Sequence, residues 1–175
     1  MVVIYSNTTG NDWQNLYSSA WNSDGIAIIS GSASDITQIT VYLQRYGSPS
    51  GNIQAHIYTC SDSTTCNASP TVSSVETLTA SSIADSETAY TFTFAEPYPS
   101  LSTEDRIVIT ATGGDSSNFI RLRLTTLSLD TGWARTAYNT SSGWYQNTAQ
   151  NIKGEIQAYS PVSASGTRLP PPPRS

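Results

Sequence analysis

The sequence predicts an all-β chain that folds as an antiparallel, jelly-roll-like β-sandwich. Apolar residues alternate with polar ones along several short segments, and clusters of Gly, Pro, Asn and Ser separate these segments. Only 12% of the residues are charged, about half the usual share, so Ser, Thr and Asn supply much of the polar surface. This alternation is typical of antiparallel strands with one buried face and one face in water.

The alternation identifies the individual strands. Within residues 39–43, the apolar Ile39, Val41 and Leu43 alternate with Thr40 and Tyr42. The only helical structure expected is a single turn, around residues 77–83 or 11–17. The remaining regular strands are predicted at 53–57, 90–94, 107–111, 120–124 and 152–158, and less regular ones at 2–5, 25–30, 75–79, 133–138 and 143–147.

The chain divides into a body and an arm. Its 175 residues suffice for one domain with a proper core, and we expect one sandwich over residues 1–159. Residues 160–175 show no alternation and form a Pro-rich segment that favours an extended polyproline II helix. We expect it to be an assembly arm that a neighbouring subunit holds. The arm residues expected to make the contact are Leu169, Pro170, Pro171, Pro172 and Pro173.

The two cysteines, Cys60 and Cys66, lie in a polar segment with five residues between them. This spacing fits a small disulfide loop that closes a turn, although two free, inert thiols are the alternative. Two thiols and one histidine elsewhere cannot make an ordinary zinc site. A disulfide indicates an oxidising compartment or assembly outside the cell, so we expect an extracellular, cell-surface or virion location.

The charge of the chain excludes two classes of partner. The net charge is −5, with only 8 Lys and Arg residues, whereas nucleic-acid binding needs a clustered basic face. Anionic membrane surfaces also attract basic segments, and no apolar run approaches the ~20 residues of a membrane span. We therefore expect neither nucleic-acid binding nor membrane insertion.

Residues 39–159 resemble a known family. The segment 39–58 is similar to the central hairpin of choice-of-anchor R type jelly-roll domains, with a strand, a Gly-Ser-Pro-Ser-Gly turn and a strand ending in Ile-Tyr. Segments 90–97, 107–118 and 143–159 match in the same order, while residues 102–107 depart from the family's pattern. The resemblance implies a secreted or surface-displayed jelly roll without catalytic residues.

Candidate catalytic residues are sparse. The single histidine, His56, falls on the polar face of a strand, whereas a catalytic triad needs a histidine held between a carboxylate and a hydroxyl. Most carboxylates lie in turns, where Asp caps the backbone. Glu155 lies in a strand beside Lys153, near Arg121 or Arg123, and indicates a cross-strand charge cluster. We therefore expect the protein not to be an enzyme.

No cofactor is expected, and calcium is a weak alternative. Asp24, Asp115 and Asp130 are the loop candidates, because Ca²⁺ prefers carboxylate and carbonyl oxygens. The chain lacks the Asp-x-Asp-x-Asp run of a dedicated calcium loop. These residues are therefore interpreted first as ordinary turn aspartates, with no metal site.

Aromatic residues supply the best binding candidates. Trp133, Tyr138, Trp144 and Tyr145 crowd one hairpin, with Arg135 among them. Exposed aromatic rings dock sugars, and Trp, Tyr and Arg are enriched at protein interfaces. The alternative is packing in the core, and for Trp133 and Trp144 both roles remain open.

Two functional hypotheses follow. The first is a non-catalytic structural subunit of an extracellular or virion surface assembly or filament, a homo-oligomer or a partner of other structural subunits, joined through sandwich edges and the arm. The second is a carbohydrate- or receptor-binding module of the adhesin type, with a glycan as ligand. Fold alone does not decide between them.

Overall fold

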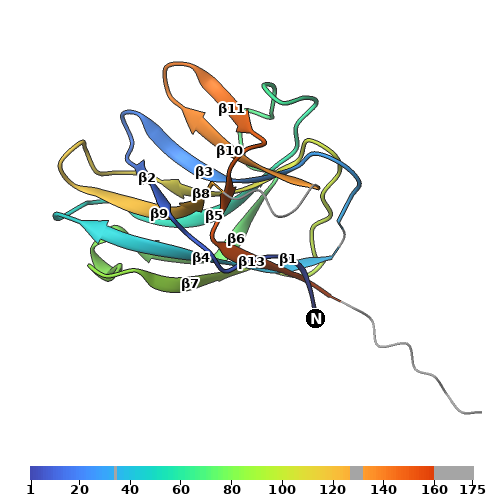
Figure 1. The fold of residues 1–175 in the computed structure, drawn as a ribbon, viewed down its shortest axis with the longest axis horizontal. Coiled ribbons are helices and arrows are strands. Elements are labelled where there is room, and N and C mark those ends of the chain that lie inside the picture. Colours follow the sequence, from blue (N-terminus) through green and yellow to red (C-terminus); the bar gives the residue numbers. More distant parts are fainter. Residues whose placement is uncertain (34, 127–131, 160–175) are drawn as a thin grey trace, which may run out of the picture.

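The computed structural model describes residues 1–33, 35–126 and 132–159, which form two antiparallel β-sheets packed face to face (Figure 1). The predicted antiparallel β-sandwich is confirmed. No helix in the described residues has the length and hydrophobicity that a membrane span requires. The predicted arm residues, Leu169 and Pro170 to Pro173, lie outside the described residues.

The first sheet is organised around its longest strand, β4 (Ile36–Tyr46). β4 pairs with β7 along one side and with β13 and β9 along the other. β1 then adds to β13, and β2 and β12 add to β9. The other strands of this sheet are β1 (Val2–Asn7), β2 (Asp12–Leu16), β7 (Thr88–Thr93), β9 (Phe119–Thr125), β12 (Asn151–Ile152) and β13 (Gly154–Ala158).

The second sheet has the strand order β11-β10-β3-β8-β5-β6. At Gly25, an added Cβ would lie 2.1 Å from the carbonyl oxygen of Ile107, so the approach of β3 to β8 requires glycine there. The strands are β3 (Trp21–Ile28), β5 (Asn52–Tyr58), β6 (Val72–Thr79), β8 (Arg106–Ala111), β10 (Trp133–Asn139) and β11 (Gly143–Asn147).

Alternate residues of the facing strands fill the core. Ile39, Val41 and Leu43 of β4 are fully buried, as their alternation with Thr40 and Tyr42 predicts. The same holds for the apolar positions of β5, β8 and β9. Side chains on the opposite parity of each strand face away from the core, and those of the second sheet form its outer face.

Two local predictions were resolved by the structure. The 3-10 helix Ala80–Ser82 lies within the segment where a helical turn was expected. The alternative turn at residues 11–17 is wrong, because β2 pairs in register with β9 from Asp12 opposite Leu124 to Leu16 opposite Ile120.

The outer face of the first sheet carries a cluster of charges, but not the predicted one. Glu87, rather than Glu155, is the central acid: its carboxylate oxygens lie 2.6 Å from Lys153 Nζ and 3.5 Å from Arg123 Nε. Glu155 instead accepts a hydrogen bond from the side chain of Gln157. The prediction failed because the β4–β7 pairing, which brings Glu87 near this face, is remote in sequence.

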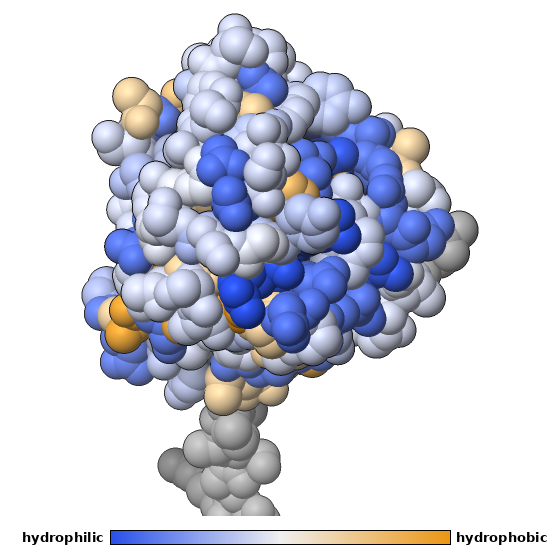
Figure 2. All heavy atoms as spheres, turned by 90° about the vertical axis from the view of Figure 1, so that its left-hand side faces the viewer, coloured by the Kyte–Doolittle hydropathy of each residue, from blue (hydrophilic) through white to orange (hydrophobic). Residues whose placement is uncertain are grey.

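The end of the sandwich at the left of Figure 1 is mostly hydrophilic or neutral, with small, scattered hydrophobic areas (Figure 2). This appearance agrees with a surface rich in Ser, Thr and Asn. The hollows described next lie elsewhere, on the outer face of the second sheet and at the strand β1.

Candidate functional site

The outer face of the second sheet carries an open cleft of about 520 Å³. The β10–β11 hairpin and the loop after β5 rise on the same side of the molecule and flank it (Figure 1). We call this hollow the hairpin cleft. Its lining residues are Asn22, Ser23, Tyr58, Thr64, Thr65, Cys66, Asn67, Ala68, Thr110, Tyr138, Gly143 and Trp144.

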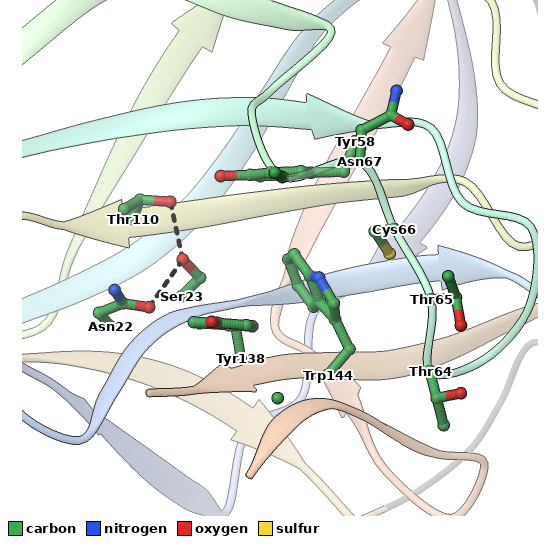
Figure 3. A pocket seen from close by; sticks show the side chains of 12 residues that line it. Asn22, Ser23, Tyr58, Thr64, Thr65, Cys66, Asn67, Thr110, Tyr138 and Trp144 are labelled. Carbon is green, nitrogen blue, oxygen red and sulfur yellow. Dashed lines mark hydrogen bonds between the residues drawn. The ribbon is translucent and has the colours of Figure 1, made fainter. Parts of the chain in front are cut away.

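Short polar residues build the turn that positions Trp144. Asn139 Oδ1 accepts hydrogen bonds from the backbone N–H of Ser141 (2.9 Å) and from its hydroxyl (2.6 Å). Gly143 has φ +80°, a conformation that favours glycine. The register of the hairpin then sets Trp144 opposite Tyr138. Because directly opposed residues share a face of a sheet, both side chains project into the cleft (Figure 3).

Three half-buried aromatic rings form one wall of the cleft. The Trp144 ring centroid lies 5.0 Å from that of Tyr58 and 5.1 Å from that of Tyr138, at interplanar angles of 65° and 60°. Such tilted arrangements are favourable for aromatic pairs. Burial, together with Tyr138, raises the pKa of the Tyr58 phenol above its ordinary value, so this hydroxyl remains protonated and can donate to a ligand.

Arg106 lies beneath Trp144 and is fully buried. Its Cζ is 4.7 Å from the indole centroid, a cation–π contact, and its Nη2 donates to the Asp62 carbonyl oxygen at 3.3 Å. Within the described residues, its Nε and Nη1 have no hydrogen-bond partner. Burial lowers the pKa of Arg106 to about 10, although the charges of Glu104 and Asp62 oppose this. The guanidinium therefore supports the indole from the protein side.

The loop after β5 forms a further wall, closed by the predicted disulfide between Cys60 and Cys66, which is confirmed. Inside the loop, the Asp62 carboxylate accepts hydrogen bonds from the backbone N–H groups of Thr64 (2.8 Å) and Thr65 (2.9 Å). These bonds hold the pKa of Asp62 well below its usual range. Thr64 and Thr65 thus line the cleft as part of a short, internally bonded loop.

Hydroxyl and amide groups face the aromatic wall. Ser23 and Thr110 are opposite each other in the β3–β8 register, and their hydroxyl oxygens are 2.9 Å apart. The Ser23 hydroxyl also contacts Asn22 Oδ1 at 3.3 Å (Figure 3). None of the lining residues carries a charge. The arrangement suits an uncharged ligand that has both an apolar face and hydroxyl groups.

The structure separates the five predicted binding residues. Tyr138 and Trp144 line the hairpin cleft. Tyr145, the next residue along β11, is not among the lining residues; it is 44% exposed and contacts Trp21 at a centroid distance of 6.3 Å. Trp133 is 8% exposed and packs in the core. Of the two roles left open for Trp133 and Trp144, Trp133 therefore takes the core role and Trp144 lines the cleft.

Arg135, the fifth predicted residue, lies inside the sandwich in a polar network. Its Nη2 is 2.6 Å from Asp24 Oδ2, and its Nε is 3.0 Å from the same oxygen. Gln14 and Gln150 accept further hydrogen bonds from the guanidinium, at 2.5 and 2.6 Å. Burial raises the pKa of Asp24 to about 6, against the lowering effect of Arg135.

The candidate calcium ligands do not come together. Asp24 was expected in a loop, which is wrong, because it is fully buried in β3 and paired with Arg135. Asp115 caps a turn by accepting from the backbone N–H groups of Ser117 and Asn118, and Asp130 lies outside the described residues. Among the described residues, no group of three or more His, Cys, Asp or Glu side chains could hold a metal ion.

His56 lies on the outer face of β5, and its Nδ1 is 2.8 Å from the Ser73 hydroxyl. Within the described part of the chain, no carboxylate bonds to this imidazole, although a triad requires one. Burial lowers the pKa of His56, which favours the neutral ring.

Comparison of the chain with models of known protein families, with curated proteins and with solved structures found no match. The function is therefore inferred from the chemistry of the hairpin cleft itself.

Sequence reasoning missed most of the cleft. Tyr58 carried a usable signal, because it precedes Cys60 by two residues and therefore lies beside the disulfide loop. Ser23 and Thr110 carried none, since they meet only through the pairing of β3 with β8, which are far apart in sequence. Arg106 was overlooked because an isolated arginine in a strand is usually a surface residue.

Proposed function

We propose that this β-sandwich is a non-catalytic binding module that takes an uncharged sugar, or a short glycan, in the hairpin cleft. The observation that carries the proposal is the Trp144–Tyr58–Tyr138 wall facing a set of uncharged hydroxyl and amide groups. The proposed class of ligand follows from this combination.

A sugar has apolar C–H groups and polar hydroxyl groups, and the hairpin cleft offers partners for both. The C–H face of a pyranose is apolar and packs on aromatic rings, while its hydroxyl groups exchange hydrogen bonds with side chains such as Ser23, Thr110 and Asn22. The cleft volume of about 520 Å³ falls in the roughly 300–1,000 Å³ range of small-ligand sites. An open cleft of this size accommodates part of a longer chain as well as a single ring.

Two further observations support the non-catalytic and extracellular parts of the proposal. Glycoside hydrolysis needs two carboxyl groups about 5–9.5 Å apart, and the lining residues supply no carboxylate. The Cys60–Cys66 disulfide is typical of oxidising compartments. We therefore place the module outside the cytosol, displayed on a cell or virion surface.

The experiment is a screen of neutral and acidic oligosaccharides, followed by titration calorimetry of any ligand found. Trp144→Ala is expected to weaken binding about tenfold or more, because it removes the central ring of the wall. Tyr145→Ala is the matched control, since it removes an aromatic ring from the same strand that does not line the cleft. Equal affinity of both variants would contradict the proposal.

A second variant distinguishes a loss of sugar binding from a folding defect caused by Trp144→Ala. Asn22→Ala changes only a half-buried rim residue, and we expect it to weaken sugar binding while the thermal unfolding curve stays unchanged. If no oligosaccharide binds the wild-type protein at millimolar concentration, the proposed function fails.

A structural role in a surface assembly is the second proposal. It is favoured by a different observation, a groove lined by apolar side chains together with Ser30 and Ser32, at the point where the chain passes from β13 into the proline-rich residues 160–175.

A further inference from the structure

A second hollow, of about 360 Å³, lies where β13 ends. β1 and β13 pair along this side, so the start of the chain and the exit of β13 lie together (Figure 1). The lining includes Val2, Ile4, Ile28, Trp133, Ala158 and Tyr159. We call this hollow the Tyr159 groove.

The Tyr159 groove gives access to the hydrophobic core. Ile28 and Trp133 belong to the core and are only 2% and 8% exposed, yet they line the groove. At the rim, Val2 and Tyr159 are 47% and 49% exposed. Among the described strands, β1 pairs with β13 and lies at the margin of its sheet. Apolar and aromatic side chains are typical of grooves that bind extended peptides.

We propose that the Tyr159 groove receives residues 160–175 of a second copy of this chain, with Leu169 and Pro170–Pro173 packing against its apolar lining. The arm begins beside the groove. Tyr159 lies on the rim of the groove and residue 160 follows it directly, so each copy carries its own arm beside its own groove. When two copies present these regions to each other, the arm of each copy lies beside the groove of the other.

Residues 1–159 and the arm differ in net charge. All 13 acidic residues of the chain precede residue 160, whereas two of the 8 basic residues, Arg168 and Arg174, follow it. Residues 1–159 therefore carry six basic against 13 acidic residues, a net charge of −7, and the arm carries +2. The lining of the groove carries no charged residue, and Asp35 lies near its rim, because the Asp35 carbonyl oxygen accepts from the N–H of Tyr159. The arm and residues 1–159 are thus of opposite net charge.

The sequence of the arm favours binding to the groove of a second copy over binding to the groove of its own chain. Residues 160–175 include Pro161 and the run Pro170–Pro173. Proline favours an extended polyproline II path over a reversal of direction, and such segments dock in aromatic-lined grooves. Trp133 and Tyr159 are the aromatic residues of this groove.

The test compares the full chain with a truncated chain, residues 1–159, by sedimentation velocity over a wide concentration range. The full chain is expected to associate as concentration rises, and the truncated chain to remain monomeric. Added salt should weaken the association, because part of it is electrostatic. Equal association of the two chains, or a full chain that is monomeric at every concentration, would overturn the proposal.

A pair of point variants locates the contact. Val2→Arg places a bulky cation at the rim of the groove, whereas Val75→Arg makes the same change at another exposed valine, on β6 in the other sheet (47% and 65% exposed). We expect Val2→Arg to abolish association of the full chain and binding of a peptide of residues 160–175 to the truncated chain, and Val75→Arg to affect neither. Matching thermal unfolding curves confirm that both variants fold. If the two variants behave alike, the arm binds elsewhere and the proposed groove is wrong.

Discussion

Arg135 and Arg106 are both buried, but they lie on opposite faces of the second sheet and have different surroundings. Arg135 points into the sandwich, where the Asp24 carboxylate and two glutamine oxygens satisfy its guanidinium. Arg106 points outward, where it contacts the Trp144 ring and, within the described residues, donates to no carboxylate: its Nη2 donates to the Asp62 carbonyl oxygen, and the charges of Glu104 and Asp62 act on it from a distance. The inner arginine is a fully bonded part of the fold.

Burial alone therefore does not determine how much a charged side chain contributes to stability. A buried ion pair is costly to break, because the partner left behind is an uncompensated charge. When an apolar residue of similar size replaces a buried arginine that has no hydrogen-bonded carboxylate, no buried carboxylate loses a bonded partner. We therefore expect Arg135 to stabilise the whole sandwich, and Arg106 to act mainly on the position of Trp144 in the hairpin cleft.

The largest effect is expected at the inner site. Arg135→Met should lower the free energy of unfolding by about 3–5 kcal/mol, because Asp24 is left buried and unpaired. Urea denaturation followed by tryptophan fluorescence measures the loss. The double variant Asp24→Leu with Arg135→Met is the control and should recover much of the stability. A loss below about 1 kcal/mol in the single variant would show that the ion pair contributes little to the stability of the fold.

The pH dependence of stability tests the Asp24 side of the same pair. Its folded-state pKa of about 6 lies above the ordinary value of 3.8, so the folded protein binds this proton more tightly than the unfolded chain does. The resulting stabilisation is fully present below about pH 4 and is lost as the pH rises through about 6, by about 3 kcal/mol in total.

Asparagine does not titrate, so Asp24→Asn is the reference for this measurement. The unfolding free energy of the wild-type protein minus that of Asp24→Asn should fall by about 3 kcal/mol between about pH 4 and pH 7. Denaturation curves at several pH values measure the difference. A difference that stays constant over this range would mean that the carboxyl keeps its ordinary pKa.

The smallest effect is expected at the outer site. Arg106→Met should change the free energy of unfolding by less than about 1 kcal/mol, because an apolar side chain of similar length replaces a poorly bonded buried charge. The emission of Trp144 should nevertheless shift, since its ring loses the guanidinium 4.7 Å from its centroid. A loss of stability as large as that of Arg135→Met would contradict the expectation that the two arginines contribute differently to the free energy of unfolding.

Much of the fold was predictable because it depends on local patterns. Alternation located β4 and β5, and the Gly-Ser-Pro-Ser-Gly segment located the turn between them. The Cys60–Cys66 disulfide followed from spacing in a polar loop. Asp24 could not be predicted, because Asn22-Ser-Asp-Gly25 has the composition of a turn, yet its pairing with β8 and β10 makes it part of a buried strand.

Local sequence patterns were enough to predict a β-sandwich with a disulfide loop and an aromatic hairpin, since these features depend on residues close together in the chain. The different places of Trp133 in the core and Trp144 in the cleft came from long-range packing. Alternation shows that a strand has two faces, but not which face another sheet covers. That choice depends on the pairing of β10 with β3 and on the loop after β5, which meet at the cleft from distant parts of the chain.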